Sequence, residues 1–176
     1  MKIAVTGTSS GFGKYLLDNW KGVYGVSLRE PIDDIISKIE PASVFINHAY
    51  SGDTKQSEVF YEVFKLWEYL PKTIINFGTS AIVENATFAP TYVSNKKHLN
   101  NLASSVAASS RYKQVRVVNF NPSTLENNEI FPENYNRLKF KELFKLIKFI
   151  VELPQSVEVS DLIIRNTQML KKTNLM

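Results

Sequence analysis

Three glycines near the start of the chain have a spacing that could bind phosphate. Gly7, Gly11 and Gly13 follow the apolar run KIAVT and precede a helical pattern. Glycine allows a tight turn, a close approach of backbone to a pyrophosphate, and close packing of the helix on the strand. The first amides of the helix favour the anion. This context predicts a dinucleotide-phosphate site rather than a tight turn alone. The candidate binding residues are Gly7, Thr8, Ser9, Ser10, Gly11, Phe12 and Gly13.

Apolar runs typical of buried strands alternate along the chain with patterns typical of helices. The strand runs are almost wholly apolar, as in parallel strands that are covered on both faces. With right-handed crossovers this predicts one α/β domain over residues 1–176, a three-layer doubly wound parallel sheet of Rossmann type with about six strands. The expected strands are KIAVT, VYGVS, SVFIN, TIINF, QVRVVNF and VEVSDLIIR; the expected helices are FGKYLLDNWK, PIDDIISKIE, SEVFYEVFKLWEYL, a helix from about Tyr92, and KFKELFKLIKFIVEL.

The composition excludes several classes of site. The chain has no cysteine, which excludes disulfides, cysteine-bound zinc and thiol nucleophiles and fits a reducing compartment. His48 and His98 are far apart and lack partnering acidic residues, so no metal site is expected. No apolar stretch reaches the roughly 20 residues that span a bilayer. An apolar run that starts at Ile3 leaves no room for a signal peptide, so we expect a cytoplasmic protein with no membrane partner.

The net charge of +4 and the isoelectric point near 9.2 could suggest nucleic acid as a partner. Many of the late lysines, however, lie in one segment with helical apolar spacing, KFKELFKLIKFIVEL. We interpret Lys139, Lys141, Lys145 and Lys148 as the solvated face of a helix. Nucleic-acid binding is therefore an unfavoured alternative, which a salt-sensitive gel shift would support.

The turn TGTSSGFG resembles the first signature, T-G-x-x-x-G-x-G, of the short-chain dehydrogenase/reductase family. The family's second signature, Y-x-x-x-K, occurs three times here and is weak evidence alone, because both residues are common. Only the pair Tyr92 and Lys96 opens the helix after strand TIINF. Thr79 and Ser80 stand thirteen and twelve residues before Tyr92, where the family keeps its catalytic hydroxyl. Thr79 is favoured, with Ser80 as the alternative.

Two further strand ends resemble the family in altered form. Its Asn-x-Ala-Gly pattern is represented by Asn47-His48-Ala49-Tyr50, in which Asn47 is expected to brace a neighbouring strand and His48 to be structural. Its Pro-Gly turn beside the nicotinamide is represented by Asn121-Pro122-Ser123-Thr124. The resemblance implies that Asn47, Ala49, Pro122 and Thr124 adjoin the cofactor.

Two features depart from the family. Only one helix lies between the runs VYGVS and SVFIN, where the family has helix, strand and helix, so the chain is one βα unit shorter than usual. The strand order should change from 3-2-1-4-5-6 toward 2-1-3-4-5-6, and the adenine side of the pocket should lose a wall. The family's catalytic asparagine would fall near Glu58 to Glu62, and that stretch contains none.

The resemblance implies reversible hydride transfer between NAD(P)(H) and a small-molecule carbonyl or alcohol, with Tyr92 as general acid and base. Lys96, one helical turn away, would together with the oxidised nicotinamide lower the pKa of the phenol from about 10 by about 1–3, and it would bind the nicotinamide ribose. Thr79 or Ser80 would hydrogen-bond the substrate oxygen. The alternative is a catalytically impaired dinucleotide-binding or scaffold protein, as the two departures suggest.

Ser27 and Arg29 at the end of VYGVS favour NADP(H), because an arginine can form a charge-assisted contact with the 2′-phosphate. NAD(H) is the alternative, since Glu30 follows and Arg29 could be a surface residue of the shortened connection.

A homodimer or homotetramer is also expected. Phe60, Phe64, Trp67 and Val106 exceed what one sheet face should cover, and the family dimerises through the corresponding helices.

Overall fold

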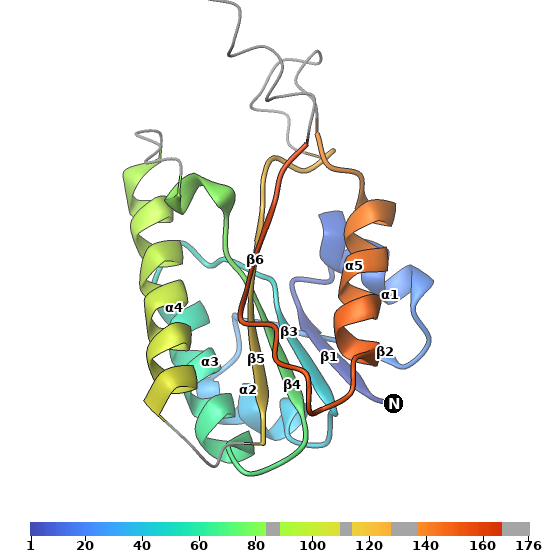
Figure 1. Ribbon diagram of the computed structural model, residues 1–176, viewed down its shortest axis with the longest axis vertical. Helices are drawn as coiled ribbons and strands as arrows, with labels where there is room; N and C mark the ends of the chain where they lie inside the picture. Colours follow the sequence, from blue (N-terminus) through green and yellow to red (C-terminus); the bar gives the residue numbers. More distant parts are fainter. Residues whose placement is uncertain (84–88, 110–113, 128–136, 167–176) are drawn as a thin grey trace, which may run out of the picture.

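One parallel sheet runs through the part of the chain that the computed structural model describes, residues 1–83, 89–109, 114–127 and 137–166 (Figure 1). Its six strands have the order β2-β1-β3-β4-β5-β6. The order expected for the loss of one βα unit is confirmed. The strands are β1 (Ile3–Thr6), β2 (Val23–Val26), β3 (Val44–Asn47), β4 (Thr73–Phe77), β5 (Arg116–Pro122) and β6 (Asp161–Ile164).

Helices cover both faces of this sheet, as the apolar strands require (Figure 1). On one face α1 and α5 pack on Ile3, Val5 and other strand residues; on the opposite face α2, α3 and α4 pack on Ala4 and its neighbours. The three-layer, doubly wound prediction is confirmed. The helices are α1 (Gly11–Asn19), α2 (Ile32–Ile39), α3 (Lys55–Trp67), a 3-10 turn η1 (Ser80–Ile82), α4 (Pro90–Ser109) and α5 (Phe140–Glu152).

The chain reverses its direction of winding between β1 and β3, because β1 pairs with β2 on one side and with β3 on the other. In open parallel sheets, ligands bind in the crevice outside the carboxyl ends of the strands at this reversal. The segments after β1, β3, β4 and β5 meet at that edge. They carry the glycine turn, His48 to Tyr50, Thr79 with Ser80, and Pro122 to Thr124.

The packing of α3 removes one of the two grounds on which an oligomer was expected, the apolar residues named above. Phe60 and Trp67 are completely buried and Phe64 is 5% exposed within the single chain, while Val106 is partly buried. The aromatic side chains are covered because α3 lies between α2 and α4 on one sheet face and contacts both. These residues therefore do not form an exposed interface, and assembly into a homodimer or homotetramer stays a prediction.

Helix α5 has the two faces that its sequence predicts. Leu143, Ile147 and Ile150 are buried against the sheet, whereas Lys141 and Lys145 are exposed. The interpretation of the lysine-rich segment as a solvated helix face fits this arrangement. Across the described residues, none of the helices has the length and apolar character needed to cross a membrane.

A buried arginine fixes the C-terminal end of α5. Arg116, 4% exposed at the start of β5, donates from its guanidinium to the carbonyl oxygens of Ile150 (2.9 Å), Leu153 (3.1 Å) and Val157 (3.1 Å), and also to that of Pro154. The last carbonyls of a helix lack intrahelical partners and carry partial negative charge. The guanidinium therefore satisfies several of them at once.

Replacing Arg116 with methionine is expected to lower the free energy of unfolding by about 2–4 kcal/mol, because buried carbonyls lose their donors. Chemical denaturation measures the effect. Lys141→Met is the matched control, since it removes the same charge from an exposed position of α5. Equal stabilities of the two variants would show that the Arg116 contacts contribute nothing beyond charge.

Candidate functional site

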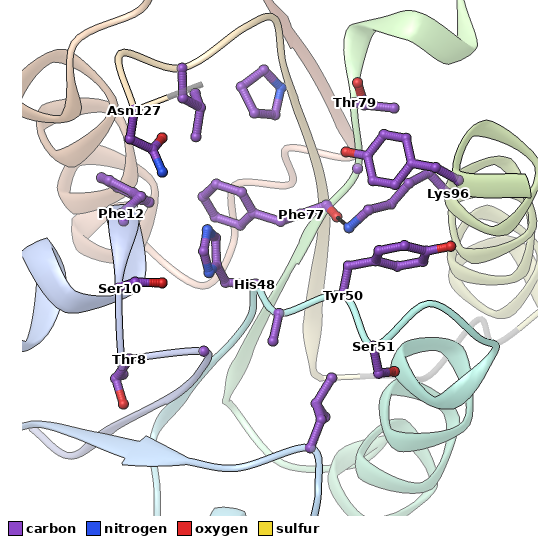
Figure 2. Close-up of a pocket in the computed structure, with 18 of the residues that line it drawn as sticks. Thr8, Ser10, Phe12, His48, Tyr50, Ser51, Phe77, Thr79, Lys96 and Asn127 are labelled. Carbon is purple, nitrogen blue, oxygen red and sulfur yellow. Dashed lines mark hydrogen bonds between the residues drawn. The ribbon is translucent and has the colours of Figure 1, made fainter. Parts of the chain in front are cut away.

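A cavity of about 1380 Å³ opens at the carboxyl edge of the sheet (Figure 2). It is lined by residues from the segments after β1, β2, β3, β4 and β5, which the strand reversal brings together. Two sequence-predicted site residues, Gly13 and Asn47, do not line it. The predicted residues that do are Gly7, Thr8, Ser9, Ser10, Gly11, Phe12, Ser27, Arg29, Ala49, Thr79, Ser80, Tyr92, Lys96, Pro122 and Thr124.

The glycine turn is built as its spacing predicts. Gly7 has φ +77° and Gly11 has φ +56°, left-handed conformations that glycine adopts without strain. A Cβ on Gly13 would lie 2.1 Å from the carbonyl oxygen of Gly7, so only glycine lets α1 approach β1 this closely. Gly13 thus packs helix on strand while Gly7 and Gly11 border the cavity.

The N-terminal end of α1 faces the cavity. Ser10 is the N-cap residue, and its side chain makes no capping hydrogen bond. The first amides of α1 are left without that partner and can bind an anion. Asn127, from the segment after β5, approaches the same turn, since a Cβ on Gly11 would lie 2.8 Å from its Nδ2 (Figure 2).

The end of β2 presents a free cation to the cavity. Ser27 and Arg29 are exposed and line it, and the Arg29 backbone amide donates to the Ser27 hydroxyl (3.2 Å). Glu30 also lines the cavity, but its charge is paired, because its Oε1 accepts from Lys38 Nζ at 2.6 Å. Within the described residues no ion pair engages Arg29. This edge of the cavity is therefore positive.

The candidate catalytic group lies where β4 ends and α4 begins. Tyr92 and Lys96 are one turn apart on α4, and Lys96 Nζ lies 5.7 Å from the centre of the Tyr92 ring. Thr79 is half-buried, its hydroxyl accepts from the Ala81 amide (3.3 Å), and it lies close enough to the Tyr92 phenol to affect its pKa. Ser80 is 3% exposed. The contact with Tyr92 thus distinguishes Thr79 from Ser80.

The proton affinities in this group differ from those expected. Burial raises the pKa of Tyr92 above its usual 10.0, and the hydrogen bond with Thr79 only partly opposes this. Burial also lowers the pKa of Lys96 from 10.5 to about 7. In the free protein Lys96 does not lower the pKa of the phenol, because removal from water disfavours the charged form of both groups. The lowering expected with oxidised nicotinamide bound stays a prediction.

The partners of Lys96 include a residue that sequence reasoning missed. Lys96 Nζ donates to Gln56 Oε1 (2.8 Å) and to the carbonyl oxygen of Phe77 (2.7 Å). Gln56 is the second residue of α3, which begins at Lys55, two residues before the expected start at Ser57. The asparagine that the family keeps on this helix is absent, and a glutamine amide contacts the lysine directly.

Asn47 supports this arrangement from inside the sheet. It is completely buried, and its Nδ2 donates to the Gln56 carbonyl oxygen (3.0 Å) and to Asn76 Oδ1 (3.0 Å). Asn47, Asn76 and Asn119 stand in register on β3, β4 and β5, so a row of buried amides crosses the sheet below the cavity. Asn47 braces the neighbouring strand, as expected, and is not a lining residue.

The side chains of His48 and Tyr50, which follow β3, line the cavity between the glycine turn and the candidate catalytic group. Tyr50, where the family pattern has glycine, packs edge to face on Tyr92 with centroids 5.0 Å apart, and its hydroxyl accepts from Asn95 Nδ2 at 3.1 Å. His48 lies between Phe12 and Phe77 (Figure 2). Burial lowers the pKa of His48 to about 4, so the ring is neutral at neutral pH. Among the described residues no cluster of histidine and acidic side chains could hold a metal ion.

Comparison with known proteins identifies the fold. No protein-family model matches the sequence, and no curated protein matches it. Solved structures do: an alcohol dehydrogenase from Thermococcus sibiricus complexed with 5-hydroxy-NADP is 14% identical, with a TM-score of 0.74 over 95% of this chain and 97% of the other.

Two further structures agree with that match. L-sorbose reductase from Gluconobacter frateurii, complexed with NADPH and L-sorbose, is 14% identical, with a TM-score of 0.71 over 93% of this chain and 94% of that one. A 4-hydroxyisoleucine dehydrogenase complexed with NADH is 16% identical, with a TM-score of 0.72 over 93% and 97%. The chain therefore has the Rossmann-type fold of short-chain dehydrogenases and reductases, and the fold expected from the resemblance is confirmed.

Proposed function

We propose that this chain is an NAD(P)(H)-dependent oxidoreductase that transfers hydride between the cofactor and a small-molecule alcohol or carbonyl. The observation that carries the proposal is the gathering of the glycine turn and of Tyr92, Lys96 and Thr79 in one cavity. The turn can hold a pyrophosphate, and the three side chains can hold and protonate an oxygen. The similar folds that were solved with 5-hydroxy-NADP, NADPH or NADH support the proposal.

The residues that line the cavity fit such a cofactor in their chemistry. A side chain at Gly7 would lie 2.9 Å from the Ala49 Cβ, so only glycine fits where the turn packs on the segment after β3. The α1 amides would bind the pyrophosphate, and Arg29 with Ser27 would bind a 2′-phosphate. Pro122 and Thr124 would lie beside the nicotinamide at the opposite end of the cavity.

The residues of α4 and β4 would manage the proton. When bound, the cofactor donates or accepts the hydride at carbon. Tyr92 would give its phenolic proton to the substrate oxygen during reduction and take it back during oxidation. Thr79, which lines the cavity with Tyr92, would orient that oxygen. The protonated form of Lys96 would stabilise the phenolate. Carbonyl reduction should therefore weaken as the pH rises through the Lys96 pKa of about 7.

The experiment that tests this function combines binding with turnover. Calorimetric titration with NADPH and with NADH should show micromolar or tighter binding, and a panel of alcohols and carbonyls should give a change in nicotinamide absorbance. Binding without turnover would favour a catalytically impaired dinucleotide-binding protein. One observation favours that second function: Lys96 is 3% exposed and already bonded to Gln56 and Phe77. Absence of binding to both cofactors would overturn both functions.

Cofactor preference gives a prediction at Arg29. NADPH is expected to bind roughly ten- to a hundredfold more tightly than NADH, because a charge-assisted hydrogen bond contributes about 1.5–3 kcal/mol. Arg29→Ala should remove this preference by weakening the binding of NADPH and not that of NADH. The dissociation constants of both cofactors measure the effect. Lys141→Ala, which removes a remote exposed charge, should change neither constant. Equal dissociation constants in the unmodified protein would show that Arg29 does not bind the 2′-phosphate.

A further inference from the structure

We propose that Gln56 is a positioning residue whose amide oxygen holds the Lys96 amino group in place and favours its protonated form. The catalytic meaning of this role rests on the proposed function, whereas the contact itself does not. Gln56 and Lys96 are each 3% exposed, and their side chains meet at 2.8 Å.

The orientation of the Gln56 amide is determined by its other neighbours. Gln56 Nε2 faces the carbonyl oxygens of Asn47 (2.7 Å) and Phe77 (3.3 Å), which can only accept hydrogen bonds. The opposite orientation would place an amide oxygen against two carbonyl oxygens. Gln56 Oε1 must therefore point toward Lys96. Asn47 secures the backbone as well, since its Nδ2 donates to the Gln56 carbonyl oxygen.

The Lys96 amine depends on very few partners. Its contacts are Gln56 Oε1 from α3 and the Phe77 carbonyl oxygen from β4, both of them neutral. The centre of the Tyr92 ring lies 5.7 Å from Nζ. The centre of the Tyr50 ring lies 5.5 Å from the same atom, and Figure 2 shows Tyr50 beside Lys96. The titratable groups that face it are Tyr92 on its own helix and Tyr50 and His48 after β3.

No carboxylate among the described residues pairs with Lys96. Within the described parts of the chain, Gln56 is then the one side chain that hydrogen-bonds this amine, because the second acceptor is backbone. Burial lowers the pKa of Lys96 to about 7. At neutral pH a change in one hydrogen bond therefore decides whether the amine is mostly charged or mostly neutral. Control of this proton would control the assistance that Lys96 gives Tyr92.

Two variants of similar length separate this role from a structural one. Gln56→Met removes the acceptor, and Gln56→Glu replaces it with a carboxylate. Both variants lose the donor to the Asn47 and Phe77 carbonyl oxygens, so a structural role alone predicts similar effects. The proposal predicts opposite effects on Lys96: its pKa should fall by about 1 in Gln56→Met and rise by about 1–3 in Gln56→Glu.

The pKa of Lys96 can be measured in the free protein by carbon NMR of lysine labelled at the ε-carbon. The Lys96 signal is the one missing from the spectrum of Lys96→Met. Shifts of opposite sign in the two Gln56 variants support the proposal; shifts of the same sign, or none in either folded variant, overturn it. Circular dichroism establishes that each variant is folded, and Gln56→Asn, too short to reach Lys96, serves as a third variant that should behave as Gln56→Met does.

The measurement requires neither cofactor nor turnover, so it stands apart from the proposed function. If NADPH binds and is turned over, the pH at which carbonyl reduction declines should move with the NMR pKa, downward in Gln56→Met and upward in Gln56→Glu. A profile that stays fixed while the NMR pKa moves would remove the catalytic meaning of the contact. Absence of turnover in the unmodified protein would count against the function and leave the contact intact.

Discussion

Replacing Tyr92 with phenylalanine is expected to lower kcat by about a hundredfold to ten-thousandfold, the usual contribution of a general acid or base. Only the phenolic oxygen and its proton are lost, and the ring keeps its edge-to-face contact with Tyr50. The dissociation constant of NADPH should therefore stay within a few-fold of its original value. Steady-state kinetics and calorimetry on the same preparation provide the two measurements.

The control for this variant is Tyr61→Phe. Tyr61 with Lys65 has the same Y-x-x-x-K spacing, with Lys65 Nζ 5.1 Å from the ring, but it lies exposed on α3. Sequence spacing alone makes the two pairs equivalent, and only their places in the fold distinguish them. Activity lost in Tyr61→Phe, or retained in Tyr92→Phe, would show that the proton donor has been assigned to the wrong pair.

The strand order could be predicted because it follows from local patterns. Fully apolar strands require helices on both faces, and right-handed crossovers then leave few arrangements. The missing βα unit was visible as a single helix between the second and third strands, and it fixed β2 as the edge strand. The glycine turn was equally local, since each glycine is required by a positive φ or by a backbone contact within that turn.

The surroundings of Lys96 could not be predicted, because they depend on contacts between distant segments. Gln56 and Lys96 are forty residues apart, and neither residue type predicts that the two side chains are in contact. One signal was present: Gln56 falls on the same helical stripe as Phe60, Val63 and Trp67, all of which are buried. A polar side chain on an apolar stripe needs a buried partner.

The pKa shifts of Tyr92 and Lys96 could not be predicted for a different reason. Spacing on a helix shows that Lys96 is near Tyr92, but it says nothing of how far either group is withdrawn from water. In the structure, burial is the largest influence on both groups and acts against the charged forms. The same withdrawal has a consequence for the stability of the whole chain, because a lysine whose pKa falls on folding opposes folding at neutral pH.

Lys96→Met is accordingly expected to abolish the stabilisation of the Tyr92 phenolate. It is also expected to remove a pH-dependent destabilisation of the folded chain. The amine has a pKa of about 7 in the folded chain and 10.5 as its ordinary value. Between these values the unfolded chain binds more protons than the folded one. The contribution of Lys96 to the free energy of unfolding therefore rises with pH across that window, and it is most unfavourable below the folded pKa.

The expected size follows from the two pKa values. Relative to Lys96→Met, the free energy of unfolding of the unmodified protein should rise by roughly 3 to 4 kcal/mol between about pH 7 and about pH 10. The variant also leaves Gln56 Oε1 and the Phe77 carbonyl oxygen without their donor, at a cost of about 1–3 kcal/mol each, but that cost does not vary with pH and cancels in the difference. Denaturant titrations of both proteins at several pH values measure it. A difference between them that stays constant from about pH 7 to about pH 10 would mean that Lys96 keeps its proton when the chain folds, and that the amine is charged in the free protein at every pH where the enzyme is expected to work.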